Sequence, residues 1–214
     1  MANAPRTSRP LQNRVAPTGE IEAVPARGLL MGNRGGQFHR PDRTLGRRRW
    51  ASRAWIACVL EWKGRHEDIW VDRHYTQLFF LDEATALAAG HRPCGYCRRA
   101  DYRRFAGLWA DTEGLAAPPK ASEMDERLHV ERWASRSDAT PAPVVGSQIP
   151  GGTIVMHDDW PSLVRAGRLW RWGFGGYERG PPLDRSALYP IVTPPKIVAI
   201  LGAGYRPLLH PSAH

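Results

Sequence analysis

The sequence predicts an α+β fold, in which a small mixed sheet with short helices surrounds a cysteine knuckle and the C-terminal third is rich in β-strands. Two runs of β-forming residues, 55–62 and 75–81, predict strands of that sheet. A Cys-x-x-Cys pair, Cys94 and Cys97, follows them and separates two segments with helical spacing. From about residue 151 onward, short β-forming runs alternate with Gly-containing turns. These patterns together favour the α+β class.

The chain is expected to divide into four parts. Residues 1–25 mix Pro, Arg, Asn and Ser without periodicity, which predicts a disordered tail. Residues 26–134 are expected to form the region around the knuckle, and residues 135–150 a linker. Residues 151–214 are expected to form a β-hairpin and a C-terminal helix, packed either separately or as one domain with the knuckle region.

Local signals define the elements beside the knuckle. After the strand over 75–81, Asp82 is suited to cap a short helix. Gly90 is suited to end that helix, because glycine enters the left-handed conformation freely. After the knuckle, residues 98–109 have the spacing of a basic amphipathic helix.

The last third is expected to be mainly β-structure. Residues 163–165 and 169–172 predict two strands that pair across an Ala-Gly turn. Residues 173–182 predict a Gly-rich loop. Thr193 is suited to cap a final helix, because the prolines that follow it are tolerated in a first helical turn.

The cysteines predict a metal site, with Zn²⁺ as the expected ion. The two-residue gap lets the sulfurs of Cys94 and Cys97 converge on one ion, but zinc requires four tetrahedral ligands. A period of two places Cys58 on the same face of its predicted strand as Trp62, and this cysteine could supply a third ligand. The alternatives are a redox-active pair without metal, and a Cys58 that serves as a small buried apolar residue.

A histidine is the expected source of the fourth ligand. His91 lies nearest to the cysteine pair in sequence, and His74 lies just before the strand over 75–81. His129 and His39 are further candidates, and the sequence leaves the choice open.

The charge pattern predicts a nucleic-acid partner, with DNA favoured. The chain has 30 Lys and Arg against 21 Asp and Glu, a net charge of +9. Arginine suits bidentate phosphate contacts, and tryptophan can stack on bases. A solvated basic surface is the alternative interpretation. The expected contact residues are Arg47, Arg48, Arg49, Trp50, Arg53, Arg99, Arg103 and Arg104.

The evidence for catalysis is limited to residue types. His129, Glu131 and Asp158 are of kinds used in acid–base chemistry, yet none lies in a diagnostic spacing. The alternative function is therefore a hydrolase- or nuclease-like enzyme that acts on an anionic substrate and whose metal is purely structural.

The sequence favours a cytoplasmic protein without a membrane partner. Three cysteines do not form a disulfide framework. No run approaches the ~18 apolar residues of a membrane span, and the N-terminus lacks the apolar core of a signal peptide.

The segment FLDEATALAAGHRPCGYC, residues 80–97, resembles the closing segment of the Ada-type metal-binding domain. In that family, too, a strand is followed by a short Ala-rich helix, an AAG-x-RP turn and a Cys-x-x-Cys pair. The resemblance covers residues 55–97, about a fifth of the chain. The matching residues are Ala88, Ala89, Gly90, Arg92, Pro93, Cys94 and Cys97, with Phe79 and Phe80 upstream.

The resemblance implies zinc binding and a role at DNA. Four cysteines hold zinc in the family, two of them in an earlier Cys-x-x-x-Cys pair, and one of that earlier pair accepts a methyl group from a DNA phosphotriester. Here only Cys58 lies at a comparable distance upstream, and no second cysteine accompanies it. The resemblance therefore does not extend to an alkyl-acceptor role for Cys58.

Overall fold

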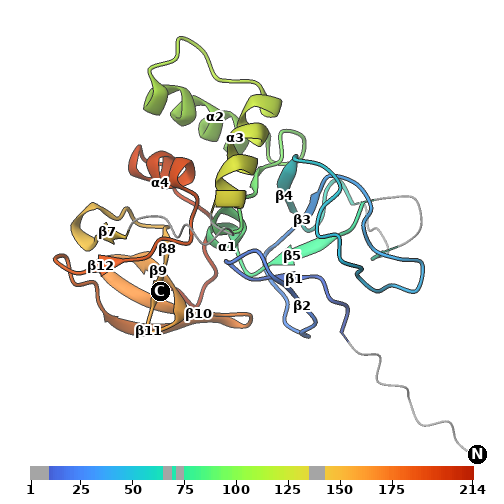
Figure 1. Ribbon diagram of the computed structural model, residues 1–214, viewed down its shortest axis with the longest axis horizontal. Coiled ribbons are helices and arrows are strands. Elements are labelled where there is room, and N and C mark those ends of the chain that lie inside the picture. Colours follow the sequence, from blue (N-terminus) through green and yellow to red (C-terminus); the bar gives the residue numbers. More distant parts are fainter. Residues whose placement is uncertain (1–9, 65–68, 71–74, 135–142) are drawn as a thin grey trace, which may run out of the picture.

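The computed structural model describes residues 10–64, 69–70, 75–134 and 143–214. Its described part contains four α-helices and three sheets, which confirms the predicted α+β class. Figure 1 shows a larger N-terminal sheet and a C-terminal sheet side by side, with α1 between them and the other helices grouped beyond α1.

The larger sheet has six strands in the order β2-β1-β5-β3-β4-β6. It is mixed, as predicted, because β1 pairs in parallel with β5, and β4 with β6, whereas the other pairs are antiparallel. The strands are β1 (Arg14–Val15), β2 (Ile21–Glu22), β3 (Leu30–Arg34), β4 (Trp55–Val59), β5 (Leu78–Phe80) and β6 (Arg92–Pro93).

Strands β1 and β2 lie inside the segment predicted to be a tail, and this part of the prediction is corrected. Val15 and Ile21 are only 1% and 2% exposed and pack in one core cluster with Leu30 and Leu78. Burial of these two side chains holds a pair of strands too short to show any periodicity in the sequence.

The C-terminal sheet is an antiparallel meander of four strands, with a two-stranded sheet beside it. The predicted hairpin is present, and its turn residues Ala166 and Gly167 both have positive φ, as a two-residue hairpin turn requires. Residues 176–182, predicted as a loop, instead form an edge strand paired with the preceding one. The strands are β8 (Ile154–His157), β9 (Trp160–Arg165), β10 (Arg168–Gly173), β11 (Gly176–Pro182), and the pair β7 (Val144–Val145) and β12 (Leu188–Tyr189). Within the predicted linker over 135–150, β7 and a 3₁₀ turn (Gly146–Gln148) are ordered elements, and residues 135–142 lie outside the described part.

Helices α2 (Arg99–Glu113), α3 (Ala121–Ala134) and α4 (Pro195–Gly202) share one apolar core. The apolar stripe predicted on the helix after the knuckle supplies Phe105 and Trp109, both nearly inaccessible to solvent. Met124 of α3 and Ile197 of α4 pack against them.

Helix α1 (Glu83–Ala88) is buried along its whole length and contacts both sheets. Ala86 packs with the core of the six-stranded sheet, whereas Ala84 and Ala88 pack with that of the C-terminal sheet. Small side chains allow this close approach on two sides. The two predicted regions therefore pack together through α1.

Two buried carboxylates begin α1, and both bind the C-terminal segment. Asp82 caps the helix as predicted, accepting a hydrogen bond from the Thr85 N–H at 2.9 Å, and it also accepts one from the backbone of His210. Glu83 accepts hydrogen bonds from the Tyr205 hydroxyl at 2.6 Å and the Leu208 N–H at 2.8 Å. Burial raises the pKa of Asp82 above its usual value.

Candidate metal centre

The three cysteines of the chain come together at one site. The sulfur atoms of Cys58, Cys94 and Cys97 all lie within 4.8 Å of one another. Tetrahedral thiolate ligands about 2.3 Å from a zinc ion lie roughly 3.8 Å apart, so this spacing suits a shared ion. The cluster could hold a metal ion.

Strand pairing brings the knuckle beside Cys58. Strand β6 runs parallel to β4, with Ala57 opposite Pro93. The N–H of Cys94 then donates to the carbonyl of Ala57 at 2.9 Å, which fixes the knuckle next to the strand that carries Cys58. The N–H of Tyr96 points back at the Cys94 sulfur, at 3.4 Å.

The two faces of the six-stranded sheet have different roles. Side chains alternate along a strand, so residues at odd separations point to opposite faces. Leu30, Ala57 and Phe80 belong to the core that faces α1. Their strand neighbours Met31, Cys58 and Phe79 line a cavity on the other face.

The thiols of the cluster differ in acidity. Thiol hydrogen bonds from Cys58 and Cys97 lower the pKa of Cys94, and the same contacts with Cys94 and Cys97 raise the pKa of Cys58. Such a group is suited to exchange its protons for a cation.

His91 lies away from the cysteines, so the structure does not bring this predicted ligand to the site. Its ring is fully buried between Trp55 at 5.1 Å and Phe80 at 4.6 Å, measured between ring centroids. The separation of three residues between His91 and Cys94 along an extended segment puts their side chains on opposite faces of the sheet. Burial, followed by the charges of Arg34 and Arg132, lowers the pKa of His91.

The structure places two further predicted fourth ligands, His39 and His129, at other aromatic contacts. His74 lies outside the described residues. His39 stacks on Trp70, and His129 lies 5.9 Å from the ring of Trp50. Within the described part of the chain, the metal-ligating group consists of the three cysteines alone.

The predicted nucleic-acid contacts on the loop before β4 differ in how far they already bind other parts of the protein. Arg48 donates to the backbone carbonyls of Trp50 and Ala51, and Arg53 forms an ion pair with Glu126 of α3. Arg49 also donates to the backbone of its own loop, and the side chain of Arg47 is exposed. Two of these arginines, Arg48 and Arg49, therefore stabilise the conformation of the loop through hydrogen bonds to its backbone.

The arginines on α2 form a second group. Arg99 and Arg103 are exposed, whereas Arg104 donates to the carbonyl of Gly204 at 2.7 Å and so ties α2 to the end of α4. Arg99 begins the helix two residues after Cys97, which links this group directly to the cysteine cluster.

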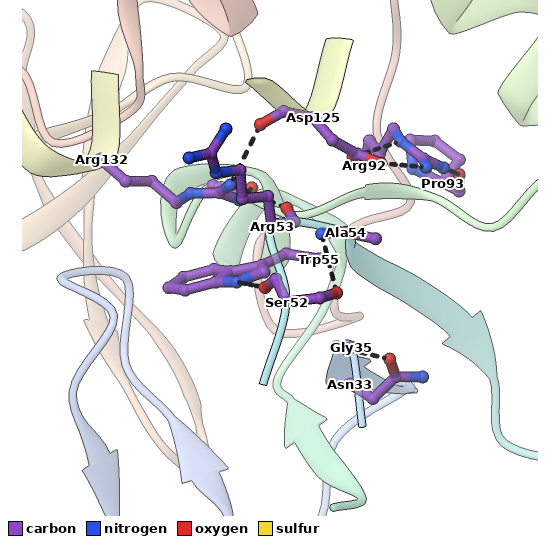
Figure 2. A network of polar contacts seen from close by, with 11 residues as sticks. Asn33, Gly35, Ser52, Arg53, Ala54, Trp55, Arg92, Pro93, Asp125 and Arg132 are labelled. Carbon is purple, nitrogen blue, oxygen red and sulfur yellow. Dashed lines mark hydrogen bonds and ion pairs between the residues drawn. The ribbon is translucent and has the colours of Figure 1, made fainter. Parts of the chain in front are cut away.

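A buried group of arginines beside the knuckle was not predicted from the sequence. The guanidinium groups of Arg34 and Arg132 lie over the Trp55 ring, with their carbon atoms 4.0 and 4.1 Å from its centroid. Figure 2 shows Arg132 above Trp55, and its guanidinium group donates to the carbonyl of Arg53 at 3.0 Å. Because Arg34 and Arg132 are far from Trp55 in the sequence, no local pattern indicates these contacts. The sequence shows only that several tryptophans have arginines nearby along the chain.

An ion pair joins α3 to β6 in the same region. Arg92 donates to both carboxylate oxygens of Asp125 at 2.8 Å, and both side chains are buried. Because Arg92 precedes the knuckle by two residues, this pair helps to hold the strand from which the knuckle emerges.

The three candidate catalytic residues lie in different surroundings. His129 lies against Trp50. Glu131 accepts a hydrogen bond from the Lys196 N–H at 3.0 Å at the start of α4 and forms an ion pair with Arg127. Asp158 is exposed in the turn between β8 and β9. The structure shows no shared site for them among the described residues.

Comparisons with protein-family models, with curated proteins and with solved structures give no match to this chain. Among the helices of the described residues, none combines the length and the apolar character needed to cross a membrane.

Proposed function

We propose that this chain is a zinc-binding, nucleic-acid-binding protein related to the Ada-type metal-binding domain, with DNA as the favoured partner. The observation that carries the proposal is the convergence of the three cysteine sulfurs within 4.8 Å. The sequence resemblance supports the family relation, because its matching residues include the two cysteines of the knuckle.

The donor set favours zinc. Thiolates are soft ligands and select zinc or copper(I) over magnesium or calcium. The cluster also joins β4 to the start of α2, two elements that are far apart in the sequence. A bound ion would thus fix the direction in which α2 leaves the sheet.

The exposed cations favour a polyanionic partner. The net charge of +9 attracts nucleic acid over long range. Arg99 and Arg103 extend from a helix whose first residue follows the cysteine cluster, so a metal ion would position them. Arg47 and Arg48 supply further exposed charge on the loop before β4.

Elemental analysis of the purified full chain tests the metal. One zinc per chain is expected, and Cys94→Ser should reduce the zinc content well below that value. Met31→Leu is the matched control, because Met31 lies opposite Cys58 on the neighbouring strand but offers no thiol. A wild-type chain that takes up no zinc when refolded with the ion refutes this part of the proposal.

Fluorescence anisotropy with duplex DNA, single-stranded DNA and RNA over a range of salt concentrations tests the partner. Replacing both Arg99 and Arg103 by Ala should lower the slope of log affinity against log salt by about 1.8 for duplex DNA, at roughly 0.9 for each phosphate contact. The control replaces Arg171 and Arg179, which are exposed on the C-terminal sheet. Salt-independent or undetectable binding to all three nucleic acids refutes the proposed partner.

A further inference from the structure

The cysteine cluster opens onto a cavity of about 450 Å³ on the outer face of the six-stranded sheet. Aromatic side chains line this cavity together with the sulfurs, chiefly Trp62, Phe79 and Tyr96. The volume lies within the range of sites for small organic molecules, which is roughly 300–1,000 Å³. A metal ion held by the three sulfurs would therefore face a space large enough for a ligand.

Three ligands from the described residues would leave one coordination position for that ligand. Structural zinc sites have four protein ligands, whereas sites with three protein ligands keep a position for an exogenous one. In the described part of the chain, the metal-ligating group has three members. Their sulfurs and the cavity lie on the same side of the sheet, so the position points into the cavity.

The net charge of the ion and its three thiolates determines whether the fourth donor is charged or neutral. A divalent ion and three thiolates together carry one negative charge, and an anionic fourth donor would raise this to two. The described residues that line the cavity include no Lys or Arg that could balance that charge, and Lys63 lies beside the lining, with its ammonium nitrogen 5.6 Å from the centroid of the Trp62 ring. The side-chain oxygen of Gln77 already accepts a hydrogen bond from the Trp70 N–H at 2.9 Å. An uncharged donor is therefore favoured in the apolar part of this cavity.

The aromatic side chains that line the cavity favour a ligand with a flat aromatic ring. The rings of Trp62 and Tyr96 lie 5.8 Å apart and tilted by 60°, and Tyr96 is 67% exposed. A flat ring that enters the cavity from solvent and approaches the cysteines can stack on one of these two side chains. Ring nitrogens of the imidazole type are good ligands of zinc.

We propose that the cavity admits a small, uncharged aromatic nitrogen heterocycle, whose ring nitrogen completes the coordination of the ion held by Cys58, Cys94 and Cys97. This inference rests on the proposed metal binding, and it names the class of ligand that the site takes. The ring stacks on Trp62 at the wall of the cavity, and its nitrogen donates a lone pair to the ion without loss of a proton.

The test uses the full chain loaded with Co²⁺, whose visible absorption reports the number and kind of its ligands. Benzimidazole is the probe. Its addition should change the Co²⁺ spectrum in a saturable manner, and Trp62→Ala should weaken the apparent affinity about tenfold, the effect of losing one aromatic stack. Trp160→Ala, which removes a partly exposed tryptophan from the C-terminal sheet, is the matched control and should leave the affinity unchanged. Benzimidazole-5-carboxylate should bind at least tenfold more weakly than benzimidazole, because of its charge.

The outcomes separate this inference from the proposed function. A chain that binds neither zinc nor Co²⁺ refutes both. A normal Co²⁺ spectrum that saturating benzimidazole does not alter refutes only the inference, as does equal binding of the carboxylate probe. A change in the spectrum of His74→Ala without any probe would assign the fourth position to the protein and also overturn the inference.

Discussion

The ion pair between Glu83 and Arg98 gives the sharpest prediction for stability. Glu83 is 2% exposed, its carboxylate lies 2.8 Å from the Arg98 guanidinium group, and the Tyr205 hydroxyl and Leu208 N–H complete its contacts. Glu83→Gln keeps the shape but removes the charge, so the buried Arg98 cation loses its buried anionic partner and keeps only the half-exposed carboxylate of Asp101, at 2.8 Å. Removing one partner of a buried pair costs about 3–5 kcal/mol of unfolding free energy.

Urea unfolding followed by tryptophan fluorescence measures this loss, because the chain has nine tryptophans. With an m-value of about 2–3 kcal/mol per M, the midpoint should fall by roughly 1–2 M. Glu126→Gln is the matched control, since Glu126 also pairs with an arginine, Arg53, but both side chains are more than half exposed. Exposed pairs contribute less than about 1 kcal/mol, so this variant should unfold close to the wild type.

A second substitution distinguishes an uncompensated charge from lost packing. In the Glu83→Gln background, Arg98→Met removes the cation that has lost its buried partner and retains only the half-exposed Asp101, and it should recover part of the lost free energy. Equal midpoints for Glu83→Gln and Glu126→Gln would refute the reasoning. So would a further loss of stability in the double variant.

Three further predictions concern the knuckle and the helix before it. Cys58→Ala should weaken metal affinity more than about 100-fold, measured by competition with a chromophoric chelator, whereas unchanged affinity would make Cys58 an apolar filler. Burial lowers the pKa of His91, so its contribution to stability is complete above the unfolded pKa of about 6.5 and is lost as the pH falls. Between pH 6.5 and 5.5 the wild type should therefore lose about 1 kcal/mol relative to His91→Phe in urea unfolding, and parallel pH profiles would contradict this. Gly90→Ala should destabilise the protein by about 1–3 kcal/mol in the same assay, because Gly90 has φ +83° and a Cβ atom there would lie 2.6 Å from the Arg132 side chain. A urea unfolding curve equal to that of the wild type would show that the turn and Arg132 adjust freely.

Elements with strong local signals could be predicted from the sequence. Asp82 caps α1 and Gly90 follows its end, because a capping carboxylate and a left-handed glycine act within a few residues. Cys58 and Trp62, which the sequence places on one face, line the same cavity. The strand itself ends at Val59, so its two-residue period does not extend to Trp62.

Features that depend on distant parts of the chain could not be predicted in this way. Proximity in sequence suggested His91 as a ligand, but its odd separation from Cys94 turns it toward Trp55 on the opposite face of the sheet. Strand β1 is stabilised by pairing with β5, whose residues follow more than sixty positions later. Two residues carry no periodicity of their own, so only the tertiary pairing reveals them.

The anchoring of the C-terminal segment on α1 has a consequence for the synthesis of the chain. The contacts that satisfy Glu83 and Asp82 come from residues 122 to 128 positions later. On the ribosome, both carboxylates thus remain without these partners until residues 205 to 210 have been made. Contacts at such separations also slow folding, because a long loop must close before they form. We therefore expect nascent chains that end before residue 205 to lack the packed contact between α1 and the C-terminal segment.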